Sequence, residues 1–144
     1  MASKSSAKGR SSSGRNYIPA IGRRKRAVAR VRLIKGKEPM MINNLPAAAY
    51  FPGLVNQKLL QEPLRLSELL EKYTATVRVV GSGITSQLLA VLHGLARAIV
   101  KLNSEKYKPR LKAAGFLRRD PRKRERRQVG TGGKSRRQKQ SPKR

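Results

Sequence analysis

The balance of charge constrains this chain more than any other feature of its sequence. Lys and Arg number 35 against seven Asp and Glu, which gives a formal net charge of +28. Self-repulsion at that charge opposes a compact state, so we expect the chain to fold beside a polyanion that neutralises it. Nucleic acid is the first candidate. A membrane partner is not expected, because we find neither an apolar span of about 20 residues nor an amphipathic helix with exposed apolar residues.

The side chains that catalysis and metal binding need are scarce. Cys is absent and His93 is the one histidine, which removes thiol nucleophiles and leaves too few ligands for zinc. The seven acids are scattered, whereas general acid–base chemistry needs two groups in one cleft. We therefore predict a non-enzymatic protein with no cofactor and no metal site, in which His93 is a structural imidazole. An enzyme that acts on RNA with His93 as its base is the alternative.

Composition divides the chain into three regions. Residues 1–16 hold six Ser and only basic charges, so we interpret them as a flexible basic extension, with an organellar presequence as the alternative. Residues 17–117 carry nearly all the large apolar side chains and should form one globular domain. Residues 118–144 hold 13 basic residues and one sizeable apolar side chain, Val129. They cannot build a core, so we expect an extended basic tail.

Hydrophobic periodicity predicts an α+β fold for the middle region. Alternating apolar residues over 26–34 and 74–80 indicate two half-buried strands, and a turn after the first leads to a short strand around 40–43. Apolar residues three and four apart over 84–102 indicate an amphipathic helix. A shorter helix should follow over about 105–114, closed by Gly115.

Proline, serine and glycine predict further local features. We expect a helical stretch after Pro46 to stop at Pro63, and Ser67 to cap a short turn beyond it. Gly94 in mid-helix indicates the close approach of another backbone. The 81–83 segment (GSG) is either a phosphate site at a helix N-terminus or a tight turn in which Ser82 or Thr85 caps the helix.

Two basic segments are candidates for binding ribonucleic acid. Four successive cations precede the first clear strand, and the outward-facing cations of that strand extend them into one basic stripe that could bind phosphates along an RNA backbone. The alternative is that this is an ordinary solvated face of a sheet. Nine of the 13 tail cations are Arg, whose planar fork binds phosphate in two places. The stripe residues are Arg23, Arg24, Lys25, Arg26, Arg30 and Arg32, and the tail residues are Arg118, Arg119, Arg122, Lys123, Arg124, Arg126, Arg127, Lys134, Arg136, Arg137 and Lys139.

Five motifs, in one order from about residue 17 to the end, resemble a known family. They are 22–32 (GRRKRAVARVR), 79–83 (VVGSG) with Gln87, 93–98 (HGLARA), 119–122 (RDPR) with 125–127 (ERR), and 143–144 (KR). Together they resemble the family of the ninth protein of the small ribosomal subunit, in its bacterial and organellar form. The chain departs from the family pattern at Ser141 and Pro142, which replace an aromatic residue near the terminus, and at Ile84 and Thr85, which replace small residues.

The resemblance implies a two-layer α+β domain of three strands, a helix, a strand and a helix, with an extended tail. It implies a structural protein of the small subunit that binds ribosomal RNA in the head beside neighbouring head proteins, in a cytoplasmic or organellar ribosome. Residues 118–139 would thread through RNA, and Lys143 and Arg144 would contact the tRNA in the peptidyl site. We expect no homo-oligomer. A non-ribosomal basic nucleic-acid chaperone is the alternative.

Overall fold

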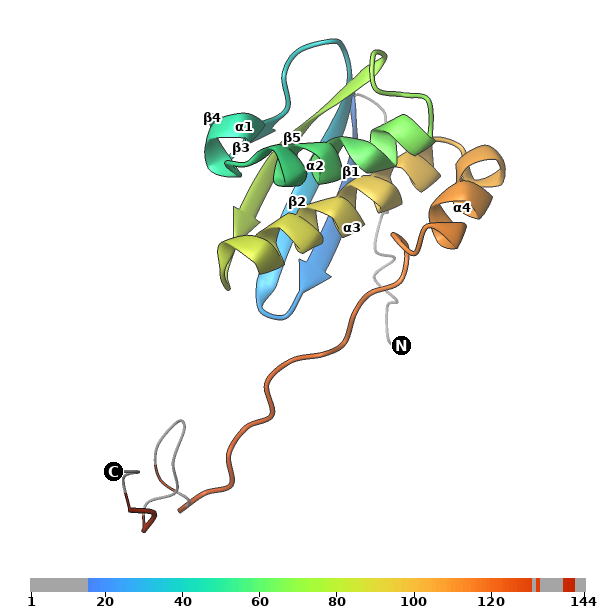
Figure 1. Cartoon of the computed structure of the whole chain (residues 1–144). Coiled ribbons are helices and arrows are strands. Elements are labelled where there is room, and N and C mark those ends of the chain that lie inside the picture. The colour runs from blue at the N-terminus through green and yellow to red at the C-terminus, as the bar shows by residue number, and fades with distance from the viewer. Residues whose placement is uncertain (1–15, 131, 133–138, 142–144) are drawn as a thin grey trace, which may run out of the picture.

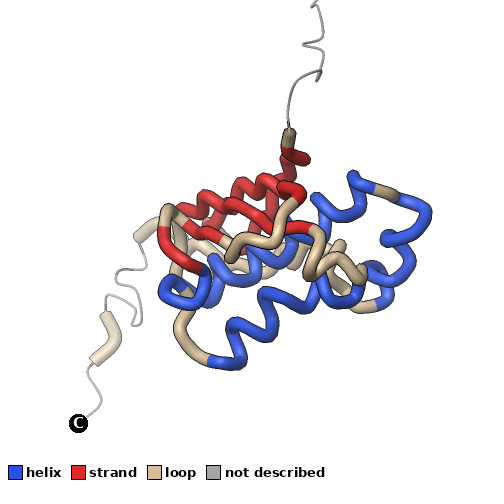
Figure 2. Tube along the Cα trace, turned by 90° about the horizontal axis from the view of Figure 1, so that it is seen from above, coloured by secondary structure: helices blue, strands red, loops and turns tan. Residues whose placement is uncertain are grey.

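The computed structural model describes residues 16–130, 132 and 139–141, and shows a sheet and a helical layer (Figures 1 and 2). The sheet order is β1-β2-β5-β3-β4, with β3 parallel to β5 and the other pairs antiparallel. The strands are β1 (Tyr17–Arg24), β2 (Ala27–Lys35), β3 (Met41–Ile42), β4 (Leu45–Pro46) and β5 (Tyr73–Val80). The helices are α1 (Ala47–Tyr50), α2 (Leu54–Leu66), α3 (Ile84–Leu102) and α4 (Ser104–Ala113). The predicted two-layer α+β class is confirmed.

Strands β2 and β5 follow the predicted alternation. Ala29, Val31 and Leu33 of β2 are at most 1% exposed, as are Val77 and Val79 of β5, so one face of each strand lies in the core. Strand β1 was not recognised from periodicity, although it pairs with β2 over its whole length. Its inward residues include Ala20 and Gly22, which are too small to produce a hydrophobic alternation.

Helix α3 covers the inner face of the sheet and has the bounds that the sequence predicts. Leu88, Leu92, Leu95 and Ile99 of its apolar stripe are buried, whereas Ile84 in its first turn is 60% exposed. Helix α4 ends at Ala113, and the predicted stop residue Gly115 follows its C-cap with a φ of +80°, a conformation that glycine adopts without strain.

Two expectations about α2 are wrong. The helix continues through Pro63 to Leu66, because Pro63 and Leu64 are buried against the core and this packing compensates for the missing N–H of proline. Ser67 ends this helix and does not begin a new turn. Its buried hydroxyl donates to the Pro63 carbonyl at 2.9 Å.

Candidate nucleic-acid interface

The outer face of the sheet, opposite the helices, carries a row of exposed arginines. Alternation in the strands directs Arg23 of β1, Arg30 and Arg32 of β2, and Arg78 of β5 to this face, where all four are exposed. Strands β1, β2 and β5 contain no Asp or Glu. We call these four residues the basic face. Arg78 was not among the predicted binding residues, although its outward position in an alternating strand was a usable signal.

Arg30 and Arg78 are direct cross-strand partners on this face. Like charges directly opposite each other in an antiparallel pair destabilise a sheet. Among the described residues, no ion pair neutralises either guanidinium. The arrangement therefore costs the isolated protein stability, and an anion bound between the two side chains would remove that cost.

The tight turn between β1 and β2 presents Lys25 and Arg26 to solvent. Gly81, at the end of β5, lies against this turn: a Cβ at Gly81 would be 2.5 Å from the Arg26 carbonyl oxygen. In the part of the chain that the structure describes, no side chain caps the N-terminus of α3, whose N-cap is Gly83, so the alternative in which Ser82 or Thr85 caps this helix is wrong. The close packing of position 81 against the Arg26 carbonyl explains why a glycine occupies that position.

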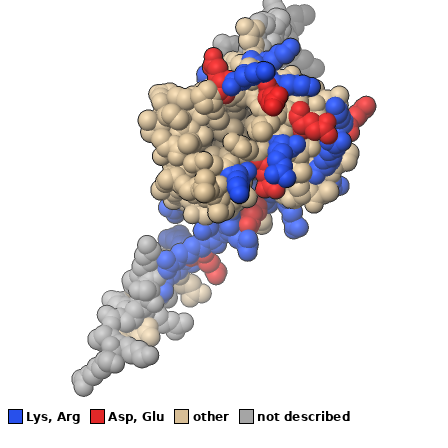
Figure 3. Space-filling model, turned by 45° about the horizontal axis from the view of Figure 1, so that its top comes forward, with Lys and Arg blue, Asp and Glu red and all other residues tan. Residues whose placement is uncertain are grey.

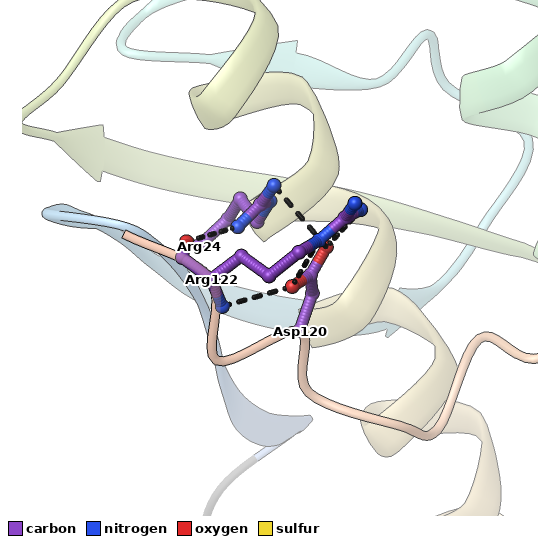
Figure 4. A network of polar contacts seen from close by, with 3 residues as sticks. All are labelled: Arg24, Asp120 and Arg122. Carbon is purple, nitrogen blue, oxygen red and sulfur yellow. Dashed lines mark hydrogen bonds and ion pairs between the residues drawn. The ribbon is translucent and has the colours of Figure 1, made fainter. Parts of the chain in front are cut away.

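Arg24 lies on the opposite side of β1 from the basic face, which corrects its assignment to the stripe. It pairs in register with the buried Ala27, and its side chain is only 11% exposed. Its Nη2 atom lies 3.1 Å from Asp120 Oδ2, and its Nη1 atom donates to the Arg122 carbonyl at 2.6 Å (Figure 4). Among the described residues, Arg24 Nε is a buried polar atom with no hydrogen-bond partner.

Asp120 joins Arg24 to the first residues of the tail, which we call its root. It accepts a hydrogen bond from the Arg122 backbone N–H at 3.0 Å, and its Oδ2 atom lies 2.8 Å from Arg122 Nη2 (Figure 4). The side-chain and backbone hydrogen bonds from Arg122, aided by the charge of Arg24, hold the pKa of Asp120 well below its usual range. We call Arg24, Asp120 and Arg122 the tail anchor. It occupies two residues that the sequence assigned to RNA binding.

Three side chains of α3 cover the outer edge of β1. Lys101 Nζ donates to the Pro19 carbonyl and Arg97 Nη1 to the Ile21 carbonyl, each at 2.6 Å, and the Arg23 N–H donates to His93 Nδ1 at 3.3 Å. Successive contacts are four residues apart on α3 and two residues apart on β1. Four residues of helix rise about 6 Å and two residues of strand about 6.7 Å, so the contacting residues of the two elements stay aligned. These contacts occupy backbone groups that an edge strand would otherwise offer to another chain.

His93 is a half-buried imidazole in this edge, and its partial burial is as predicted. Burial lowers its pKa, the charge of Arg97 lowers it further, and a backbone hydrogen bond to Leu117 partly opposes them. Because Nδ1 accepts from Arg23, the neutral imidazole is the form that fits this site. Sequence reasoning missed the shared role of His93, Arg97 and Lys101, although their spacing of four residues was a signal.

Beyond Arg122, the described tail has no helix or strand through residue 128 and leaves the domain as an extended segment (Figure 1). Arg118, Arg119, Lys123, Arg124, Arg126, Arg127 and Lys139 are exposed. The predicted residues Lys134, Arg136, Arg137, Lys143 and Arg144 lie outside the described residues.

The description "Ribosomal protein S9/S16" belongs to the family model that matches this chain, over residues 22–144. The chain belongs to the ribosomal protein S9/S16 family. The match takes in the basic face, the tail anchor and the tail. It confirms the resemblance read from the five motifs.

Membership in the S9/S16 family makes this a structural ribosomal protein of the small subunit. It implies a location in a ribosome, cytoplasmic or organellar, and binding to ribosomal RNA and to other ribosomal proteins. Within the described part of this S9/S16 protein, no three His, Cys, Asp or Glu side chains form a metal-binding group. The helices of that same part are all too short or too polar to cross a membrane.

Proposed function

We propose that the basic face and the tail bind small-subunit ribosomal RNA in the head of the subunit, and that Lys143 and Arg144 contact peptidyl-site tRNA during translation. The observation that carries the proposal is the opposed pair of Arg30 and Arg78. Two arginines that lie directly opposite each other in neighbouring strands, with no ion pair to a carboxylate among the described residues, are costly in the free protein and suit a phosphate bound between them.

The mechanism is electrostatic. Each cation that neutralises a phosphate releases condensed counterions, so log K falls with log salt by about 0.7 to 0.9 per contact. The basic face supplies sequence-independent contacts to the backbone of folded RNA, and the tail adds further cations at positions that the domain cannot reach. Together they neutralise packed phosphates and stabilise the local RNA fold.

Salt-dependent binding to a ribosomal RNA fragment from the subunit head tests the basic face. The double variant Arg30→Ala with Arg78→Ala should flatten the salt dependence by about 1.4 to 1.8 units of slope. The matched control is Lys58→Ala with Arg65→Ala, which removes two exposed cations from α2 in the helical layer. Equal losses in the two variants would contradict the proposal, as would equal affinity for duplex DNA at matched salt.

Truncation of residues 141–144 tests the tRNA contact. We expect assembled small subunits to contain the truncated protein at normal levels and to retain peptidyl-site tRNA less well, because the removed segment has two cations and no large apolar side chain in its sequence. Dissociation of tRNA from purified subunits is the measurement. Failed assembly, or unchanged tRNA retention, would show that the terminus has a different role.

A further inference from the structure

Two long segments of this basic protein carry no charged side chain. Asp, Glu, Lys and Arg make up 29% of the chain, yet residues 39–57 and 79–96 contain none of them. The first runs from before β3 to the start of α2, and the second from the end of β5 into α3. Burial in the core explains the lack of charge over much of α3, but not at the exposed positions of the two segments. An RNA-binding surface needs cations, so these exposed positions suit another purpose.

The fold brings the two uncharged segments together. Asn43 Nδ2 donates to the Val79 carbonyl and the Val79 N–H donates to Asn43 Oδ1, each at 2.9 Å. The Tyr50 hydroxyl donates to Gln87 Oε1 at 2.8 Å, and Asn43 Nδ2 lies 3.2 Å from the same hydroxyl. These bonds satisfy the polar groups between the segments with one another.

What the joined segments leave exposed is mainly apolar. Leu54 is 75% exposed, Val55 70%, Ile84 60% and Leu45 50%. We define the uncharged face as Leu45, Pro46, Ala48, Ala49, Leu54, Val55 and Ile84, all of which are exposed. Figure 3 shows a broad surface at the left of the molecule without Lys, Arg, Asp or Glu, on the side where Figure 1 places α1, β3 and β4.

The uncharged face and the tail anchor lie at opposite edges of the sheet. The strand order puts β1, with its cationic edge contacts and Arg24, at one end, and β4, with Leu45 and Pro46, at the other. Phosphates are attracted to the first edge, whereas the two residues of β4 at the second edge carry no charge. The two edges therefore suit partners of different chemistry.

We propose that the uncharged face docks another protein of the small subunit through an apolar, uncharged patch on that protein. This inference rests on the proposed function, because it assumes assembly on ribosomal RNA. Proteins that lie among packed phosphates are themselves cationic, and two such proteins repel each other where charged surfaces meet. A contact without charge on either side avoids that repulsion and buries the exposed apolar side chains.

Site-specific photo-crosslinking in assembled small subunits tests the docking site. A benzoylphenylalanine at position 55 should give a product that resists ribonuclease and disappears with protease, and whose partner is one defined protein of the purified subunit. The same probe at position 78, on the basic face, should give a ribonuclease-sensitive product. Crosslinks from position 55 to RNA or to a second copy of this chain, or none at all, would overturn the docking proposal. Failure of the position 78 probe to reach RNA would instead contradict the proposed function.

A pair of charge substitutions on α2 provides an independent test. Val55→Lys introduces a cation into the uncharged face, and Gln61→Lys introduces the same cation on an exposed position of the same helix outside that face. In competition with the unmodified chain for incorporation into small subunits, Val55→Lys should be disfavoured by about tenfold and Gln61→Lys should compete equally. Equal incorporation of both variants would overturn the proposal. Denaturation of each purified variant checks that both fold.

Discussion

Gly22 of β1 and Gly94 of α3 lie in backbone contact. A Cβ at Gly22 would be 2.3 Å from the Gly94 nitrogen and 1.9 Å from the Ala90 carbonyl oxygen, distances that no side chain tolerates. A Cβ at Gly94 would be 2.6 Å from Val31 Cγ2. The close approach expected from a glycine in mid-helix is thus confirmed, and its partner is a glycine that begins the longest sequence motif.

Gly22→Ala should destabilise the domain by about 3 kcal/mol or more, because backbone atoms of α3 must move away from β1. Urea denaturation measures the change. Gly83→Ala is the control, since no atom lies within 4 Å of a Cβ at that position and its φ of −94° suits alanine. Similar losses in both variants would show that α3 has room to shift.

Arg78→Thr should stabilise the free protein by about 0.2 to 1 kcal/mol, because it removes the repulsion of Arg30 and places a β-branched residue in a strand. The same change should lower the salt slope of RNA binding by about one unit. Arg32→Thr is the control, since Arg32 faces Thr76 and its guanidinium lies over the Tyr17 ring at 5.2 Å. The Arg32→Thr substitution should not increase the free energy of unfolding. A destabilised Arg78→Thr protein would mean that the opposed pair carries no strain.

Acidification should destabilise the fold through His93. The folded state lowers the pKa of this imidazole below the unfolded value of about 6.5. The stability that the neutral His93 side chain contributes is therefore fully present above that pH. It is lost as the pH falls from the unfolded value through the lower folded one, because Nδ1 then takes the proton in place of the Arg23 N–H. His93→Gln should show a shallower dependence of unfolding free energy on pH between 7.5 and about 5. Identical slopes would exclude His93 as the titrating group.

Asp120→Ala should release the root of the tail without unfolding the domain. The Arg24 guanidinium then loses its carboxylate, and the Arg122 N–H loses its acceptor. Amide hydrogen exchange over residues 117–122 should accelerate on the order of tenfold, since local opening sets the rate. Glu125→Ala is the matched control, because it removes an exposed carboxylate three residues beyond the anchor. Equal acceleration in both variants would show that Asp120 does not hold the tail.

Periodicity predicted the elements whose buried face is clearly apolar, such as α3, β2 and β5. It failed where packing overrides local preference. Strand β1 presents Ala20 and Gly22 inward because α3 approaches closely, and α2 continues past Pro63 because that proline is buried. Neither fact is visible in a single segment, since each depends on which other element lies against it.

The candidate site, too, could be predicted from the sequence only in part. The outward positions of Arg30, Arg32 and Arg78 followed from strand alternation, but Arg24 lies on the other side of β1 and contacts Asp120, which is distant in the sequence. The small inward residues of β1 hide its alternation. The sequence therefore does not show on which side of the sheet each arginine of this strand lies. The edge contacts of His93, Arg97 and Lys101 likewise needed the position of α3 beside β1.

The sequence by itself determined the α+β class, the basic tail, the scarcity of catalytic side chains and the motifs of the family, because composition and local spacing report each of them directly. Only the tertiary structure decided that Arg30 opposes Arg78, that Arg24 anchors the tail and that two uncharged segments form one face. These relationships depend on strand register and on the packing of α3 against β1. Such contacts join residues that no local pattern relates, so the sequence does not reveal them.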